Sequence, residues 1–463
     1  MVQRWQPPRL QLMDPDATSR HTPAVLGHTD AGPTRQVLLQ MADLRHHLHL
    51  CGATGTGKTT TLLRLALADI HAGRGVAVIE PRGDLIRDLL DRMPAEAADR
   101  LVLIDPDDTT APPALNVLDP AGRGGEAVAE HLVSTLHKLY HQWWGPRVED
   151  TLRAAAFTLT RHHPGTATLA DIPLLLTSSH YRRAATAPAR REDPTGIGAF
   201  WDAFDALGAT GQANLCGPVL SKLRAVTSRG FVSDLFGVAA STFDPADILD
   251  GGILLVRAPK GQLGDDACQL VGSLLLAALW QAATARASRS EAARPDAHVY
   301  LDEAQNFLHL PTALDDALAE ARGYRVAFVL AHQHLDQLTP ALRAAAATNA
   351  RNKLYFGLSP EDARHLARHV GPHLDKHDLA HLAAFQAAAR LIHHHAPGAG
   401  FTLATLPAPP PIPGRAEQLR TAAQTRGLPA AQRAHLARRR LRDTTRPRPR
   451  HSEPPSPTPL AEL

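Results

Sequence analysis

The chain has 463 residues, of which 44% are hydrophobic and 21% charged, and its net charge at pH 7 is only +3. This composition excludes a fibrous or wholly disordered chain, and the length exceeds what one ordinary hydrophobic core supports. The three cysteines, Cys51, Cys216 and Cys268, form no paired motif. Their scatter argues against a disulfide framework and a cysteine zinc site, and it fits a reducing cytoplasm.

The first 35 residues are rich in proline and lack the apolar core and cleavage site of a secretory signal. We expect them to be irregular, and we expect a short strand at Gln36–Leu39. The apolar residues Leu48, Leu50 and Cys51 predict the end of a buried strand. Apolar residues then recur at helical spacing and predict a helix over Thr60–Ile70. These segments predict a strand–loop–helix unit over residues 48–70.

The loop of this unit fits the phosphate-binding pattern G-x-x-x-x-G-K-[ST]. Its glycines let backbone N–H groups turn toward phosphate oxygens, Lys58 would contact the β- and γ-phosphates, and the Thr59 hydroxyl would ligate Mg²⁺. The phosphates would lie at a helix N-terminus, which favours anions. A glycine-rich surface turn is the alternative. The predicted nucleotide-binding residues are Gly52, Ala53, Thr54, Gly55, Thr56, Gly57, Lys58, Thr59 and Thr60.

Strands are predicted next at Val76–Glu80 and Leu101–Ile104, with a helix at Leu85–Met93 between them. Alternating strands and helices predict an α/β fold with a mainly parallel sheet. From about Gly125 to Gly237 the pattern is helical: starting at Val128, for example, apolar residues recur every three or four positions and form one helical face. We interpret this stretch as an inserted all-α subdomain.

The sheet is predicted to resume with four further strands, with a helix near Ala313–Ala321. The uncharged run Ala267–Thr284 has the length of a membrane span, but it contains two glutamines and lies between predicted core strands, which favours a buried helix. The four strands are expected at Ile253–Ala258, His298–Asp302, Arg325–Ala331 and Asn352–Gly357.

These segments predict four regions. Residues 1–35 form an irregular N-terminal segment, 36–120 with 238–406 a P-loop NTPase domain, 121–237 the inserted all-α domain, and 407–463 a disordered tail rich in proline and arginine. Arg415–Arg450 holds eleven arginines against two acidic residues. This positive charge suits DNA phosphates or an acidic partner, and it equally suits a solubilising tail.

Three further features suggest catalysis. An apolar strand ends in Asp302 and Glu303, the Walker B arrangement, in which one carboxylate holds hydrated Mg²⁺ and the next polarises the attacking water. Gln333 follows another strand, where an amide would lie beside the γ-phosphate. Arg322 could reach the phosphate of a neighbouring subunit as an arginine finger, or it could be a surface arginine at a helix end.

Several motifs together resemble a known family, the type IV secretion coupling proteins. These are the TraD/TraG-like conjugative DNA-transfer ATPases of the HerA–FtsK group of P-loop NTPases. The resemblance runs from about Val25 to Leu406. It is carried by CGATGTGKTT, EPRGDL, WGPRVEDTLR, KGQLG, VYLDEAQNF and VLAHQ, in that order along the chain.

The resemblance implies a RecA-like motor domain, a homo-hexameric ring around single- or double-stranded DNA, and ATP hydrolysis with Mg²⁺ at subunit interfaces. By motif, Thr59 and Asp302 would bind Mg²⁺, Glu303 would activate water and Gln333 would sense the γ-phosphate. Arg322 stands eleven positions before Gln333, where the family has its trans-acting arginine.

The chain departs from the family in two places. Glu80 and Arg82 stand where the family usually has Asp-Pro-Lys, and this sequence predicts none of the transmembrane helices that family members usually carry ahead of the motor domain. We therefore expect a cytoplasmic protein, recruited to the inner membrane face by a membrane-anchored secretion partner or a relaxase, or working in the cytosol. Two alternatives stay open: a soluble HerA/FtsK-like translocase for repair or chromosome handling, and a nucleotide-dependent switch or scaffold that moves no DNA.

Overall fold

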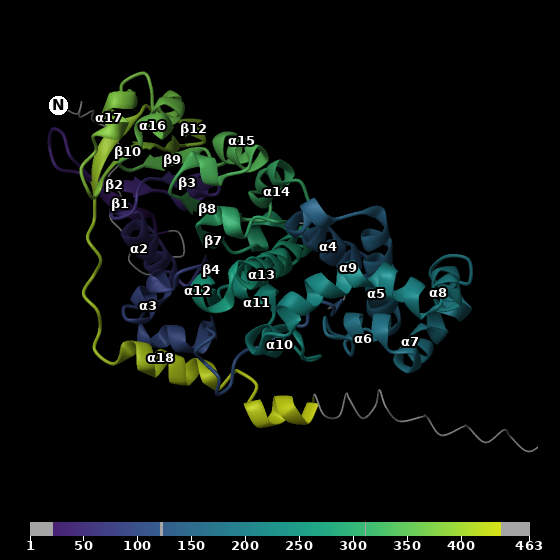
Figure 1. Ribbon diagram of the computed structural model, residues 1–463. Coiled ribbons are helices and arrows are strands. Elements are labelled where there is room, and N and C mark those ends of the chain that lie inside the picture. The colour runs from purple at the N-terminus through teal and green to yellow at the C-terminus, as the bar shows by residue number, and fades with distance from the viewer. Residues whose placement is uncertain (1–21, 121–123, 311, 437–463) are drawn as a thin grey trace, which may run out of the picture.

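The computed structural model describes residues 22–120, 124–310 and 312–436. Its centre is an 11-stranded sheet, and a separate two-stranded ribbon joins β11 (Ile392–His393) to β12 (Ala396–Pro397). Figure 1 shows the sheet at one end of an elongated molecule and a group of helices at the other. In spatial order the strands are β2 (Gln36–Leu39), β1 (Ala24–Thr29), β13 (Phe401–Thr405), β10 (Gln386–Arg390), β9 (Asn352–Tyr355), β3 (Leu48–Cys51), β8 (Val326–His332), β7 (Ala297–Asp302), β4 (Gly75–Glu80), β6 (Ile253–Arg257) and β5 (Leu101–Ile104).

The seven strands from β9 to β5 pair in parallel, which confirms the predicted α/β class with a mainly parallel sheet. Every residue of these strands is buried, because helices cover both faces, and this explains why most of the strands are largely apolar rather than alternating. Parallel pairing also brings the carboxyl ends of β3, β4, β7 and β8 to one edge of the sheet, where ligands of such sheets bind.

The other four strands form an antiparallel wing that the sequence did not predict in full. The segment 1–35 was expected to be irregular, whereas the structure has β1 at Ala24–Thr29, paired with β2 and with β13. A bulge between Val25 and Gly27 interrupts the alternation, and the strand depends on a partner almost 400 positions away. Residues 1–21 lie outside the described part of the chain.

Helices divide the apolar core between the two faces of the sheet. On one face α2 (Lys58–His71) and α3 (Asp84–Leu90) pack against the sheet. On the other face lie α13 (Asp265–Ala285), α14 (Leu314–Ala321) and α15 (Pro340–Asn349). The short helices of this domain are α1 (Met41–Leu44), α12 (Lys260–Leu263), α16 (Pro360–Leu366) and α17 (Lys376–Ala380).

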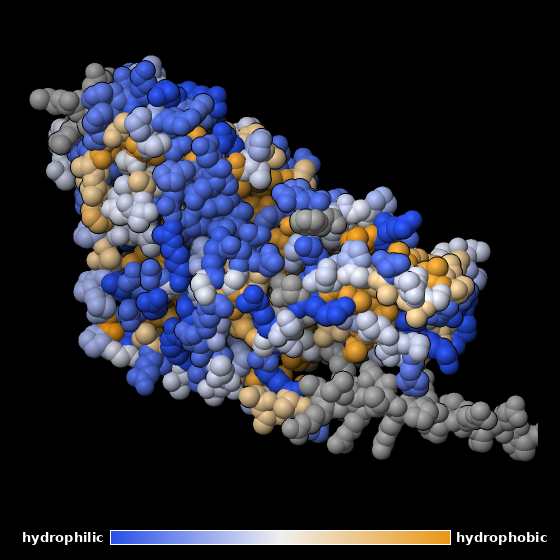
Figure 2. Space-filling view, viewed as in Figure 1, coloured by the Kyte–Doolittle hydropathy of each residue, from blue (hydrophilic) through white to orange (hydrophobic). Residues whose placement is uncertain are grey.

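Helix α13 is the run that the sequence assigned to the core. The segment Asp265–Ser288 is long and apolar enough to cross a membrane, but 89% of its most apolar window is buried inside the protein. The prediction of a buried helix at Ala267–Thr284 is therefore confirmed. On the face seen in Figure 2, hydrophobic residues form patches among hydrophilic ones, and the sheet domain presents a predominantly polar surface.

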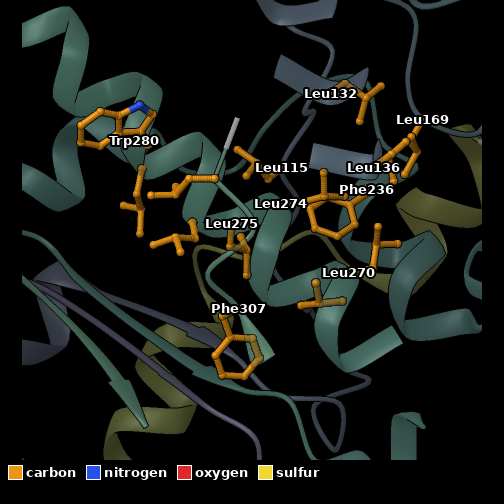
Figure 3. Packing of buried hydrophobic residues seen from close by; sticks show 14 of the residues in the cluster. Leu115, Leu132, Leu136, Leu169, Phe236, Leu270, Leu274, Leu275, Trp280 and Phe307 are labelled. Carbon is orange, nitrogen blue, oxygen red and sulfur yellow. The ribbon is translucent and has the colours of Figure 1, made fainter. Parts of the chain in front are cut away.

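The helical insert lies between β5 and β6, as predicted. Its first helix packs on α13, so the insert and the sheet domain share one core; Figure 3 shows Leu132 and Leu136 of the insert close to Leu270 and Leu274 of α13. The helices between β5 and β6 are α4 (Gly125–Leu139), α5 (Pro146–His162), α6 (Asp171–Thr177), α7 (Ser179–Glu192), α8 (Ile197–Ala206), α9 (Ala209–Thr227), α10 (Gly230–Phe236) and α11 (Pro245–Leu249).

The C-terminal segment is ordered further than expected. The sequence predicted a disordered tail from residue 407, whereas α18 (Arg415–Gln424) packs against α3 and β5 (Figure 1). Leu419 is fully buried there, and Arg420 donates to Asp105 at 2.7 Å. One buried leucine and one ion pair stabilise a helix whose composition alone suggested a solvated chain. The arginine-rich residues 437–463 lie outside the described part of the chain.

Candidate nucleotide site

A cavity of about 150 Å³ lies at the carboxyl edge of the parallel strands. Four strand ends supply its walls, because β3, β4, β7 and β8 run in the same direction. It is lined by Thr54, Gly55, Gly57, Lys58, Thr59, Thr60, Arg82, Asp302, Glu303, Gln333 and Phe385.

The predicted phosphate loop connects β3 to α2, and Lys58 is the first residue of that helix. Gly57 precedes it with φ of 114°, a left-handed conformation that side chains rarely adopt. The buried Lys58 ammonium donates hydrogen bonds to Gly52 O and, at 3.0 Å, to Ala53 O. Burial lowers the pKa of Lys58, so an anion in the cavity would stabilise its charge.

The nine predicted loop residues fall into two groups. Six of them line the cavity: the exceptions are Gly52, Ala53 and Thr56, which shape the loop instead. Thr56 Oγ1 donates to Ala53 O at 2.7 Å, and a Cβ at Gly52 would lie 2.6 Å from Cβ of Phe356. These three residues hold the loop closed so that the other six face the cavity.

The two acidic residues at the end of β7 face the same cavity. Burial, and then the neighbouring charge of Glu303, raise the pKa of Asp302 to about 6. Glu303 adopts φ of 52°, an uncommon conformation for a residue with a side chain, and its N–H donates to Asp302 Oδ1 at 3.2 Å. Strain of this kind is common at functional sites.

Three side chains hold the Glu303 carboxylate. Arg82 Nη2 lies 2.7 Å from Oε1, Gln305 Nε2 donates to Oε2 at 2.9 Å, and Gln333 Nε2 donates to Oε1. Gln333 Oε1 also accepts a hydrogen bond of 3.0 Å from Thr54 Oγ1. The amide of Gln333 thus bridges the phosphate loop and Glu303.

Arg82 is a site residue that the sequence analysis did not select. It was noted only as part of a departure, at positions where the family usually has Asp-Pro-Lys. The feature that could have identified Arg82 is its position just after β4. This strand pairs directly with β7, whose end carries Asp302 and Glu303. Glu80, at the end of β4, accepts hydrogen bonds from the N–H groups of Leu85 and Ile86, and burial raises its pKa to about 7.

Arg322 is not brought to this cavity. It is exposed at the C-terminus of α14, just before β8 begins, whereas Gln333 follows the end of β8. The seven residues of β8, at roughly 3.3 Å each, separate the two by about 20 Å. Within one subunit Arg322 therefore lies at the edge of the sheet opposite the cavity.

The residues of the cavity fit a nucleotide with magnesium. A buried ammonium and the N-terminus of the 14-residue helix α2 favour phosphate oxygens. Thr59 and Asp302 line the same cavity with hard oxygen donors, the ligands that Mg²⁺ prefers. In the described part of the chain no group of three or more His, Cys, Asp or Glu side chains could hold a metal. Magnesium usually binds through one or two protein groups together with substrate phosphates.

The fold of the chain resembles the folds of several solved structures. The bacterial conjugative coupling protein TrwBdeltaN70 aligns with a TM-score of 0.59 and 14% sequence identity over 85% of this chain and 90% of that chain. The chain shares the fold of this coupling protein. TrwB in complex with a non-hydrolysable GTP analogue aligns with a TM-score of 0.56 and 16% identity over 80% of this chain and 87% of that chain.

A second kind of protein shares the fold, and one sequence family matches. VirB4 of Thermoanaerobacter pseudethanolicus aligns with a TM-score of 0.53 and 14% identity over 85% of this chain and 98% of that chain. Residues 296–378 match the family described as the TraM recognition site of TraD and TraG. A sequence comparison with curated proteins gives no significant match. The predicted resemblance to TraD/TraG-like coupling proteins is thus confirmed, in sequence over residues 296–378 and in fold over most of the chain.

Proposed function

We propose that this protein is an ATP-hydrolysing DNA translocase of the conjugative coupling-protein type. The observation that carries the proposal is the meeting of Lys58, Asp302, Glu303 and Gln333 around one cavity, on a fold shared with TrwB. The match of residues 296–378 to the TraM recognition site of TraD and TraG supports a protein partner of the TraM kind. One TrwB structure contains ADP with Mg²⁺, and another contains a non-hydrolysable ATP analogue.

Each residue has a role that follows from its chemistry. Lys58 and the loop N–H groups bind the β- and γ-phosphates, and Thr59 and Asp302 hold Mg²⁺, which neutralises charge on the transferred phosphoryl group. Glu303 orients and polarises the attacking water. Gln333 contacts both Thr54 and Glu303, so it can report the presence of a γ-phosphate to the catalytic carboxylate.

Arg322 fits this scheme only across a subunit interface. Its place at the opposite edge of the sheet prevents it from reaching the cavity of its own subunit. In a homo-hexameric ring, that edge would face the cavity of the next subunit, and the guanidinium would stabilise the transition state there.

The test is steady-state ATP hydrolysis by the full chain, with and without single- or double-stranded DNA, at two salt concentrations. A motor should show several-fold stimulation that fades with salt, because phosphate contacts weaken as counterions compete. Lys58→Ala should lose nucleotide binding. Glu303→Gln, of nearly equal volume, should keep binding and lose turnover.

Slow turnover that DNA does not change would refute the motor. A nucleotide-dependent switch would then be the better description of the chain. Stimulation by DNA with no binding to a relaxase or a membrane-anchored partner would instead favour a cytosolic translocase for repair or chromosome handling.

A further inference from the structure

An aromatic side chain at the edge of the cavity has no part in the chemistry described above. Phe385 lines the cavity, and 46% of its surface is exposed, which makes it the most exposed large hydrophobic residue in the described part of the chain. A single exposed hydrophobic residue is common on protein surfaces. Phe385 differs from such a residue in its backbone, its contacts and its position in the sheet.

The backbone of Phe385 is strained and fixed on both sides. Its φ is 62°, in the left-handed region, which is rare for a bulky residue. Its N–H donates to Thr56 O in the phosphate loop at 2.8 Å. Its carbonyl accepts from both the N–H and the hydroxyl of Thr405, at 2.8 and 3.0 Å. The chain therefore holds this residue in one place despite the strain.

The ring lies directly beside the phosphate loop. A Cβ at Gly57 would lie 3.0 Å from Cδ1 of Phe385, so the lack of a side chain at position 57 leaves room for the ring. The ring thus borders the N-terminus of α2, where phosphates are expected.

The strand order gives the direction of the ligand. From β3, which leads into the phosphate loop, β8 and β7 lie on one side and carry Gln333, Asp302 and Glu303. On the other side lie β9 and β10, and Phe385 immediately precedes β10. A triphosphate with its γ-phosphate at the acidic side would therefore point its opposite end toward Phe385.

We propose that Phe385 is the platform on which the nucleobase stacks. The inference rests on the proposed function, since it extends the same nucleotide site. An aromatic face stacks on any base. Ala383 and Ala384 carry no side-chain donor or acceptor to read a base edge, and the amide of Gln386 is already bonded to Asp30 and to the Ala383 N–H. The subsite therefore binds the base by its face and takes adenine and guanine alike.

The test compares a ligand that has a base with one that does not. Dissociation constants of ATP, GTP and inorganic tripolyphosphate would be measured by calorimetry on the full chain. Phe385→Ala and Phe385→Leu should weaken ATP and GTP about equally, by roughly 5- to 100-fold, the usual range for loss of one base–aromatic stack. Both variants should leave tripolyphosphate unchanged, and Phe385→Tyr should bind all three ligands as the wild type does.

The leucine variant keeps the apolar cover over Gly57 and removes only the aromatic face. Ile412→Ala, at another partly exposed apolar residue (39%), is the matched control and should change nothing. If the alanine and leucine variants weaken ATP and tripolyphosphate together, Phe385 shapes the loop and the proposal is wrong. Unchanged ATP affinity in both variants would also overturn it, while the nucleotide site stands if Lys58→Ala loses ATP. A wild type that binds no ATP would refute both proposals.

Discussion

The buried carboxylate of Asp302 is expected to lower the stability of the fold, although the proposed Mg²⁺ site needs it. The exposed fraction of Asp302 is 5%, and burial together with the Glu303 charge raises its pKa from 3.8 to about 6. In the unfolded chain the carboxyl would titrate near its ordinary value. A pKa difference of about 2, at about 1.4 kcal/mol per pKa unit, means that the ionised form destabilises the fold by about 3 kcal/mol at pH 7.5.

Asp302→Asn should therefore make the protein more stable. The amide keeps the oxygen that accepts the Glu303 N–H and removes the charge. Without Mg²⁺ and nucleotide, the melting temperature at pH 7.5 should rise on the order of 3–6 °C for a chain of this size. Magnesium nucleotide should then stabilise the wild type more than the variant, because the variant lacks the carboxylate ligand.

The pH dependence fixes the sign of the effect. A carboxyl with a raised pKa binds its proton more readily in the folded protein, so this contribution favours folding more as the pH falls from about 6 toward 4. The advantage of the variant should fade over the same window. Asp336→Asn, whose side chain is 85% exposed, is the control and should change stability little. Equal melting temperatures at pH 7.5, or a difference independent of pH, would refute this reasoning.

Three further variants test other contacts of the structure. Arg82→Ala should lower kcat about 10-fold with little change in KM, since it removes a charge-assisted hydrogen bond from the buried Glu303, and the arginine of this pair is half exposed to solvent; Arg87→Ala, an arginine paired only at the surface, should change neither parameter. Arg322→Ala should bind ATP but not turn it over, and mixing it with Lys58→Ala subunits should restore activity; no rescue would contradict a finger acting in trans. Leu419→Ala should destabilise the docking of α18 by about 2–5 kcal/mol, seen as faster amide exchange over residues 415–424, and unchanged exchange there would show that α18 is not held by this leucine.

The parts of the molecule that were predicted well from the sequence are those marked by a short, continuous sequence pattern. The phosphate loop is one continuous motif, and the parallel strands are apolar runs between breakers. Strand β10 was missed because its sequence QAAAR favours a helix by intrinsic propensity, and only pairing with β9 and β13 makes it a strand.

The parts of the site that the sequence did not give depend on long-range contacts. Arg82 and Glu303 are 221 positions apart, and their pairing follows only from the adjacency of β4 and β7. Phe385 stands among alanines with no motif around it. Its importance comes from a left-handed backbone and a position beside Gly57, neither of which a local pattern reveals.

The turn that carries the Walker B acids also touches the helix that supports the insert. Asn306 donates to Glu303 O at 2.9 Å, and the next residue is Phe307, which is labelled in Figure 3. Phe307 packs so tightly on Gly272 of α13 that a Cβ at that glycine would overlap its ring. Ser273 of α13 donates to Phe307 O at 3.4 Å. Interiors packed this densely transmit small displacements instead of absorbing them. If Glu303 shifts when a nucleotide binds, the displacement would reach α13 through Asn306 and Phe307, and we expect the helical insert, which packs on α13, to move with this turn.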